Sequence, residues 1–234
     1  GSGDAAGDQA TFNWPRGAAL SAGGSWVLIS EEGTGILRRM DLSAGAVSTV
    51  VGKPQDPGCG VGLSGSAGLA ATSDSAALLL TSPNSHVVQR IDLSTGAATN
   101  LAGQYGIYWG SADGLRDAAQ FNNPAGIAVS ADGAFALLVD RTHFTIRMLD
   151  LTTGQVTTLA GSPDQYGSAD GIGSAARFQN PYGIALSDDG AFALVADEQN
   201  HTIRRIDVAT RQVTTVAGAA GQSGSADGVG NAAR

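Results

Sequence analysis

Short apolar runs separated by polar turns recur along the chain, and the clearest set lies near its C-terminal end. Gly183–Leu186 and Ala191–Ala196 are apolar and flank a turn, Ser187–Gly190, that ends in Asp-Gly. Two further runs, Thr202–Asp207 and Gln212–Ala217, alternate apolar and polar residues. Alternation predicts half-buried strands, and Asp-Gly between two such runs indicates a hairpin. This stretch therefore predicts short antiparallel strands and no helix.

The same pattern repeats along the whole chain. Ser111–Gly167 aligns with Ser168–Gly224 at an offset of 57 residues and without a gap. The aspartate that closes the third strand recurs at steps of 51, 58 and 57 residues, as Asp41, Asp92, Asp150 and Asp207. Repeats of this length indicate units that bury their apolar faces against neighbouring units, and four strands per unit are typical of a β-propeller blade.

We therefore expect an all-β fold, a β-propeller built of four-stranded antiparallel blades. The four units span approximately residues 1–52, 53–110, 111–167 and 168–223 and form a single array over residues 1–234. Residues 224–234 begin a further linker and stop one residue before the expected phenylalanine. We expect either a further blade in the parent protein or contact of this segment with a neighbouring subunit.

The linkers between units share Gly-Ser-Ala-Asp-Gly followed by a Phe-x-x-Pro element. We expect Phe121 and Phe178 to fill the gap between neighbouring blades, and the proline of each element to direct the chain into the next inner strand. The linker aspartates are expected to accept hydrogen bonds from turn amides. They are Asp4, Asp113, Asp170 and Asp227.

The linker that precedes the second unit departs from this pattern. Val51–Gly68 is about seven residues shorter than the other linkers and lacks the Phe-x-x-Pro element. The interface between the first two blades must therefore be filled differently, and Cys59, Val61 and Leu63 are the candidates.

The motif residues resemble those of NHL-repeat β-propellers, whose pattern runs Pro-x-Gly-Ile-Ala-Val, Asp-Gly, Ala-Asp, Asn-His-x-Ile-Arg and an apolar residue before Asp. The fourth unit matches it at Pro181, Gly183, Ile184, Ala185, Asp189, Gly190, Ala196, Asp197, Asn200, His201, Ile203, Arg204, Ile206 and Asp207. The third unit matches nearly as well, whereas the first two are degenerate. The resemblance implies a ring larger than four blades, six being typical of the family, although a closed four-bladed ring stays open. It does not give a function, because propellers host many unrelated activities.

Charge and composition exclude some classes of partner. The formal net charge is −8, and the twelve arginines and the single Lys53 form no cluster, so we expect no nucleic-acid partner. No apolar run approaches 18 residues, so we expect no membrane insertion by this segment. The single Cys59 cannot form an internal disulfide. Low lysine content and abundant small residues fit an extracellular or cell-surface location, and a cytoplasmic one stays open.

The three histidines are the candidates for a metal site. Amidating lyases with NHL-like propellers hold a metal on histidines around the central channel, so the resemblance implies this alternative. However, His86 and His201 occupy the same repeat position, where Phe144 follows His143 in the third unit. Repetition favours a structural role, and zinc needs at least three converging ligands. We therefore predict no catalytic residue, no cofactor and no metal.

Paired carboxylates and linker aspartates give no better site. Glu31 with Glu32, and Asp188 with Asp189, lie in expected loops and are interpreted as solvated. Each linker carries one aspartate in its Gly-Ser-Ala-Asp-Gly stretch, too few for calcium.

The residues that break the repeat are better candidates for binding. Tyr105, Tyr108 and Trp109 gather in one linker, where they either form a binding patch or cover the gap beside the second blade. Trp14, Arg141 and Phe144 are further candidates, and Tyr182 is a weaker one. We predict a non-enzymatic protein-interaction or assembly module that binds a protein partner or itself. Two alternatives are a metal-dependent lyase or lactonase-like enzyme with a site in the central channel, and a structural component of an extracellular or cell-surface assembly.

Overall fold

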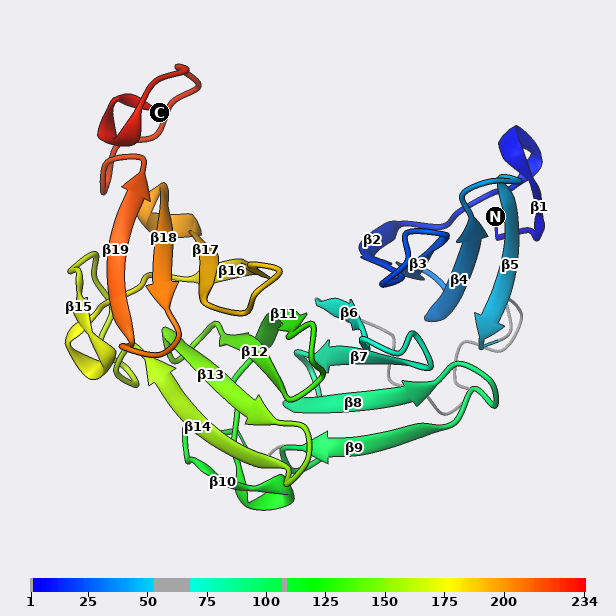
Figure 1. Ribbon diagram of the computed structural model, residues 1–234, viewed down its shortest axis with the longest axis horizontal. Helices are drawn as coiled ribbons and strands as arrows, with labels where there is room; N and C mark the ends of the chain where they lie inside the picture. The colour runs from blue at the N-terminus through cyan, green and yellow to red at the C-terminus, as the bar shows by residue number, and fades with distance from the viewer. Residues whose placement is uncertain (1, 53–67, 107–108) are drawn as a thin grey trace.

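Four antiparallel sheets are arranged around an open arc (Figure 1), and each sheet takes its strands from one repeat unit. The computed structural model describes residues 2–52, 68–106 and 109–234 of the chain. Within each sheet the four main strands follow one another in chain order from the axis outwards. The predicted all-β propeller architecture is therefore confirmed. In the part of the chain that is described, no helix has both the length and the apolar character needed to span a membrane.

The strand bounds agree with the sequence pattern. Blade 1 contains β2 (Pro15–Leu20), β3 (Trp26–Glu31), β4 (Ile36–Asp41) and β5 (Ala46–Val51). Blade 2 contains β6 (Leu69–Ala71), β7 (Ala77–Ser82), β8 (Val87–Asp92) and β9 (Ala98–Ala102). Blade 3 contains β11 (Pro124–Val129), β12 (Phe135–Asp140), β13 (Thr145–Asp150) and β14 (Gln155–Ala160). Blade 4 contains β16 (Pro181–Leu186), β17 (Phe192–Asp197), β18 (Thr202–Asp207) and β19 (Gln212–Ala217).

Three linkers add a short fifth strand that the repeat pattern did not predict. These strands are β1 (Ala5–Ala6), β10 (Gly114–Leu115) and β15 (Gly171–Ile172). Each pairs with the outermost strand of the blade that follows it, as β10 does with β14 through Gly114 opposite Val156. A linker has to pass that outer edge on its way to the axis, and the edge offers unpaired backbone groups.

Short 3₁₀ helices follow these strands and occur at two further points of the chain. They are η1 (Gly7–Gln9), η2 (Arg116–Ala118), η3 (Gly173–Ala175), η4 (Glu198–Asn200) and η5 (Gly230–Ala232).

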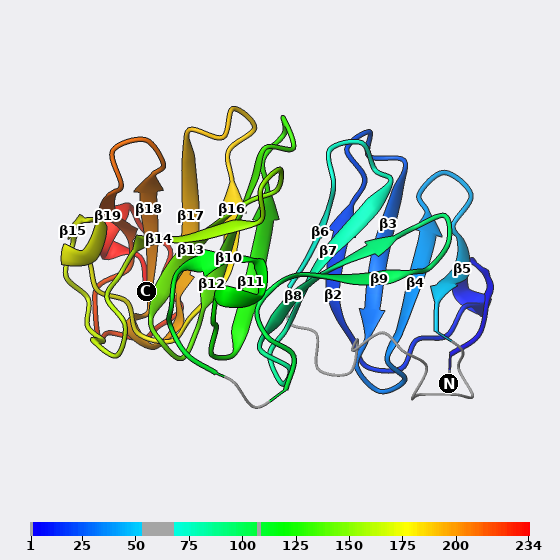
Figure 2. The same ribbon diagram turned by 90° about the horizontal axis from the view of Figure 1, so that it is seen from below.

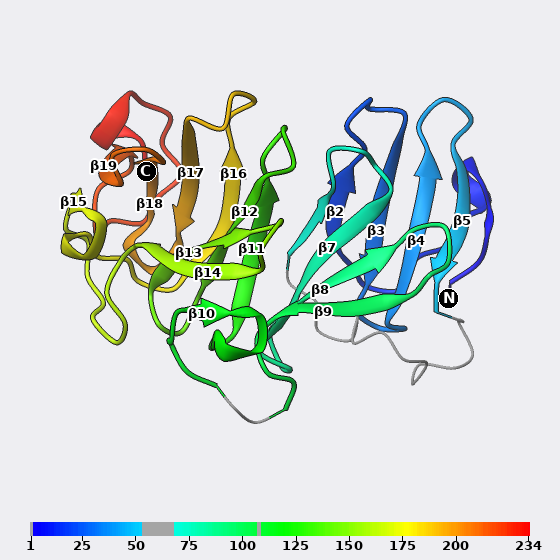
Figure 3. The ribbon, with the colours of Figure 1, turned by 60° about the horizontal axis from the view of Figure 1, so that its bottom comes forward.

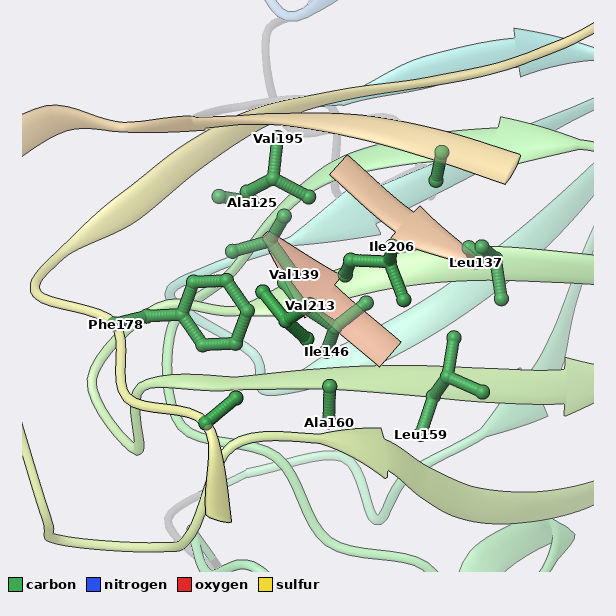
Figure 4. Packing of buried hydrophobic residues seen from close by; sticks show 12 residues of the cluster. Ala125, Leu137, Val139, Ile146, Leu159, Ala160, Phe178, Val195, Ile206 and Val213 are labelled. Atoms are coloured by element: carbon green, nitrogen blue, oxygen red, sulfur yellow. The ribbon is translucent and has the colours of Figure 1, made fainter. Parts of the chain in front are cut away.

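The apolar cores lie between blades rather than within them. Three clusters of buried side chains join blades 1 and 2, blades 2 and 3, and blades 3 and 4. Phe121 belongs to the second cluster and Phe178 to the third, and both side chains are fully buried. Figure 4 shows the Phe178 ring pointing into its cluster. The predicted role of these two phenylalanines is thus confirmed.

A fully buried arginine ties each complete linker to its blade. Arg147 of β13 pairs with the buried Asp140 at 3.2 Å and with Asp113 of the linker at 2.7 Å. Its guanidinium also donates hydrogen bonds to the linker carbonyls of Gln120 and Ala112, and lies 5.3 Å from the ring centroid of Phe121. We call this arrangement the arginine anchor. It holds the linker, the phenylalanine and the blade edge with one side chain.

The anchor recurs in blades 1 and 4 with nearly identical geometry. Arg204 pairs with Asp197 at 2.9 Å and Asp170 at 2.8 Å, and lies 5.1 Å from the Phe178 ring centroid. In blade 1 the equivalent residues are Arg38, Glu31, Asp4 and Phe12. The interpretation of Glu31 as a solvated loop residue was therefore wrong, because Glu31 ends β3 and is fully buried beside Arg38.

Three of the four linker aspartates, Asp4, Asp113 and Asp170, bind a strand rather than a turn. Asp170 accepts hydrogen bonds from the amide and hydroxyl of Thr215 in β19, and Asp4 and Asp113 bond Thr49 and Thr158 in the same way. Burial acts to raise the pKa of Asp170, but the hydrogen bonds from Thr215 and Arg204 outweigh it and hold the pKa below its usual range. The ionised carboxylate therefore stabilises the fold above about pH 4, and this contribution is lost as the pH falls further.

Blade 2 lacks the anchor. Gln89 stands at the position of the arginine and Ser82 at that of its buried carboxylate, and the Ser82 hydroxyl donates to Gln89 Oε1 at 3.3 Å. The same unit has the short linker without the Phe-x-x-Pro element. Linker and anchor are thus altered together. The candidates for filling this interface, Cys59, Val61 and Leu63, lie outside the described residues.

Glycines bring the inner strands close together around the axis. A Cβ atom at Gly68 would lie 2.4 Å from the carbonyl oxygen of Ala125, and one at Gly126 would lie 2.6 Å from that of Tyr182. No side chain fits at such a distance, so packing at the axis requires a glycine at these two positions.

The anchor can be tested by copying blade 2 into blade 3. Arg147→Gln leaves Asp140 buried without its cation and should lower the free energy of unfolding by about 3–5 kcal/mol in urea denaturation. The double variant Arg147→Gln/Asp140→Ser reproduces the Gln89 and Ser82 pair and should lose less than the single variant. Arg205→Gln, on a half-exposed neighbour, is the control and should cost about 1 kcal/mol or less. Equal losses for the single and double variants would contradict a buried ion pair.

Candidate interaction surface on the linker rim

The linkers and the loops between the second and third strands lie at the same end of the propeller. Pro124 at the start of β11 pairs with Asp140 at the end of β12, and Ile146 of β13 pairs with Ala160 at the end of β14. We call this end the linker rim; Figure 2 shows it along the lower edge, with the β16–β17 turn at the upper edge. The register therefore places Arg141 and Phe144, whose side of the propeller the sequence left open, on the linker rim.

Four aromatic side chains of the linkers are largely exposed. They are Trp14 at 74%, Tyr166 at 67%, Trp109 at 62% and Tyr105 at 61% exposure. Tyr105 and Trp109 therefore do not fill the gap beside blade 2, which was the alternative interpretation; Tyr108 lies outside the described residues. Figure 3 shows the linker that contains β10 at the lower edge, beside β9 and β14.

Tyr166 was missed by the sequence analysis, although a signal was present. Trp109 and Tyr166 both directly precede the Gly-Ser-Ala-Asp-Gly stretch of their linkers. An aromatic side chain therefore recurs at one linker position, and it is exposed both times.

Trp14 occupies a backbone conformation that does not suit it. Its φ is 52°, in the left-handed region, and the equivalent residues of blades 3 and 4, Asn123 and Asn180, have φ values of 61° and 48°. Asparagine tolerates this region far better than a bulky aromatic residue. Folding stability therefore does not explain a tryptophan at this exposed position.

Charged and aromatic side chains bridge the two ends of the array at the linker rim. Arg16 of β2 binds Glu32 at 2.6 Å and donates to the Tyr182 hydroxyl of β16 at 3.1 Å. Arg141 binds Glu198 at 3.0 Å, and its guanidinium lies 5.2 Å from the centroid of the Tyr182 ring. Tyr182 is thus the centre of a network that joins blades 1, 3 and 4. Of its members, only Arg141 and, more weakly, Tyr182 are binding candidates on the sequence alone.

The loop of blade 3 adds a second group to this rim. Phe144 and Tyr166 make an edge-to-face contact with ring centroids 5.8 Å apart. His143 is buried beside them, with Nδ1 3.3 Å from Asp140 Oδ2 and Nε2 3.8 Å from Asp164 Oδ1. His143 therefore connects the arginine anchor to the linker that carries Tyr166.

The repeated histidine position is a sharp turn. His86, Phe144 and His201 all adopt a positive φ, at 58°, 57° and 56°. His86 Nδ1 accepts a hydrogen bond from the Asn123 amide at 3.3 Å, and His201 lines a cavity on the outer side of blade 4. Residues 2–52, 68–106 and 109–234 contain no group of three or more His, Cys, Asp or Glu side chains that could hold a metal ion.

The fold is that of a β-propeller array, and its repeated motif resembles that of NHL-repeat proteins. No family model matches the chain. Protein SUPPRESSOR OF QUENCHING 1, chloroplastic, of Arabidopsis thaliana is 28% identical over 249 residues, covering 94% of this chain and 22% of that protein. NHL repeat-containing protein 2 of Bos taurus is 26% identical over 249 residues, covering 90% and 33%. The homologous protein of Gallus gallus is 37% identical over 95 residues, covering 41% and 12%.

These relatives confirm the resemblance to NHL-repeat proteins, and the chain spans a third of their length or less. Solved structures agree in fold. An auxiliary nutrient-binding protein from Bacteroides ovatus superposes with a TM-score of 0.64 at 15% identity, covering 87% of this chain and 47% of that one. A Bacteroides thetaiotaomicron protein of unknown function gives 0.62 at 18%, covering 100% and 65%. At these identities the likeness concerns the fold alone.

The environment of His86 predicts a low pKa for its imidazole. Burial disfavours the charged ring, so its pKa lies below the usual 6.5, although the charge of Asp140 acts in the opposite direction. The hydrogen bond from Asn123 to Nδ1 also requires the neutral ring. We expect NMR titration of the His86 ring protons to give a midpoint below 6.5. A midpoint at or above that value would contradict this hydrogen bond.

Proposed function

We propose that this propeller array is a non-enzymatic protein-interaction module that presents its linker rim to a protein partner. The observation that carries the proposal is the exposure of Trp14, Tyr105, Trp109 and Tyr166 in linkers on one rim. Exposed tryptophan and tyrosine side chains are enriched among residues that dominate binding energy at interfaces.

The scaffold beneath these side chains already holds the linkers in place before a partner binds. The arginine anchors fix the linkers of blades 3 and 4 through Arg147 and Arg204, each of which contacts both a linker carbonyl and a linker aspartate. Residues on a linker held in this way lose little conformational freedom on binding, so more of the contact energy becomes affinity.

Charge suggests which protein surfaces fit. The chain carries a formal net charge of −8, and on the rim Arg16 and Arg141 are each already paired with a glutamate. The partner surface that suits this rim combines apolar side chains with an excess of lysine and arginine, because opposite charge accelerates association.

The location of the protein stays a prediction. The plant relative is chloroplastic by name, and that statement concerns that protein. For this chain an extracellular or cell-surface location is proposed on composition only, and a cytoplasmic one stays open.

Alanine substitution of the linker aromatics tests the proposal. The triple variant Tyr105→Ala/Tyr108→Ala/Trp109→Ala should weaken binding of an identified partner, or self-association, at least about tenfold, since single interface aromatics are often worth 2 kcal/mol or more. Dissociation constants from calorimetry would measure the loss, and circular dichroism would verify that the sheets remain folded.

Leu115→Ala is the matched control, because Leu115 is an exposed apolar residue of β10 that takes no part in the rim network. Its partner affinity should equal that of the wild type. A triple variant that binds as tightly as Leu115→Ala would refute the patch.

A further inference from the structure

The outer face of blade 4, which points away from blade 3, resembles an interblade interface without its second half. Three of its apolar side chains are exposed: Leu194 at 39%, Ile203 at 38% and Val216 at 38%. The equivalent side chains of blade 3 are covered by blade 4: Leu137 at 0%, Ile146 at 0% and Leu159 at 3% exposure. The outer face of blade 4 therefore carries the same kind of apolar side chains that are buried between blades 3 and 4.

A cavity of about 300 Å³ opens in this face, with Ile203, Ala217 and Gly218 among its lining residues. The same repeat positions in blade 2 are Val88, Ala102 and Gly103. They form the wall for Phe121, since Val88 and Ala102 share its cluster and a Cβ at Gly103 would lie 3.0 Å from its ring. The cavity therefore occupies the place that a linker phenylalanine fills between blades 2 and 3 and between blades 3 and 4.

The backbone of the last linker is already seated like that of the preceding one. Gly218 N donates to Gly230 O at 3.1 Å, as Gly161 N does to Gly173 O at 3.1 Å. Arg234 N donates to Ala226 O at 2.9 Å, which matches Arg177 N to Ala169 O at 2.9 Å. Ala233 and Arg234 also line the cavity.

The inner edge of blade 4 has room for another inner strand. A Cβ at Gly126 of blade 3 would lie 2.6 Å from the Tyr182 carbonyl of the next inner strand, whereas the nearest atom to a Cβ at Gly183 is Ala196 Cβ at 3.8 Å. Blade 4 therefore has the glycine, Gly183, that permits close approach of a neighbouring inner strand. Among the described residues, no such strand lies beside it.

We propose that this cavity binds the phenylalanine of a Phe-x-x-Pro segment, and that the outer face of blade 4 packs against the further NHL-type blade which such a segment begins. The charge of Glu198 on blade 4 also predicts one residue of that further blade. Arg141 of blade 3 binds Glu198 and lies against Tyr182, whereas blade 4 offers Glu198 itself at the position of Arg141. The docking blade therefore carries a basic residue at a position equivalent to Tyr182 or Glu198.

The arc leaves space for such blades. Arg16 of blade 1 and Tyr182 of blade 4 meet at 3.1 Å although their blades are three steps apart along the array. Blades three steps apart lie opposite each other across the axis of a six-bladed ring. Two further blades between blade 4 and blade 1 would complete that ring and would also cover Phe12, which is half-buried where Phe178 is fully buried.

Extending the chain tests the cavity directly. We would append the nine residues Phe-Gln-Asn-Pro-Tyr-Gly-Ile-Ala-Leu, copied from Phe178–Leu186, after Arg234. Burial of the added ring should raise the melting temperature by about 4 °C or more over the same extension with alanine in place of its phenylalanine. The rise should vanish in an Ala217→Trp background, whose indole fills the cavity. Equal melting temperatures for the phenylalanine and alanine extensions in the wild-type background would overturn the proposal.

Sedimentation velocity of the 234-residue chain separates a further blade from a second copy as the occupant. We expect a monomer at micromolar concentration for the wild type, for Phe12→Ala and for the control Leu115→Ala. A dimer that Phe12→Ala abolishes and Leu115→Ala preserves would show that a second copy inserts its own Phe12, and the assignment to a further blade would be wrong.

Discussion

A guanidinium group buried between two carboxylates governs how this chain passes from one blade to the next. Removing an arginine from water costs several kcal/mol, and the cost is offset only where the geometry satisfies it from several sides. Arg38, Arg147 and Arg204 meet this condition through a carboxylate on the second strand, a carboxylate on the linker, two linker carbonyls and the face of a phenylalanine. The linker must adopt one path for all these contacts to form together, so a polar interaction determines where the apolar ring is buried.

Once the anchor determines the linker path, the exposed linker side chains contribute little to the cores between the blades. Trp109 and Tyr166 lie directly before the anchored segment, and both are exposed. Trp14 follows its anchored phenylalanine by two residues and adopts a left-handed conformation that asparagine would fit better. The rim is thus a place where side chains can change without disturbing a core, which is how loops on rigid scaffolds acquire binding functions.

The repeat made most of the architecture predictable, since strands such as Thr202–Asp207 and Gln212–Ala217 have the bounds that their alternation indicated. The anchor was not predictable in the same way. Its arginine is periodic in the sequence, but charged residues are usually solvated, and the partners of Arg204 lie 7 and 34 residues away. Glu31 was misjudged for the same reason. The contact of Arg16 with Tyr182 spans 166 residues and depends on the curvature of the array, which no local pattern specifies. The exposure of Tyr105 and Trp109 likewise depends on how closely blades 2 and 3 pack.

The missing anchor of blade 2 has a consequence for how the protein can be altered. Gln89 and Ser82 are neutral, so a change in the length of the preceding linker leaves no charge unpaired at the anchor position, whereas an insertion after Asp113 or Asp170 would leave a guanidinium buried without its linker carboxylate. With respect to the anchor, the junction before blade 2 therefore tolerates inserted sequence better than the junctions before blades 3 and 4. It is the natural position for grafting a peptide, a fluorescent domain or an affinity tag without dismantling the propeller.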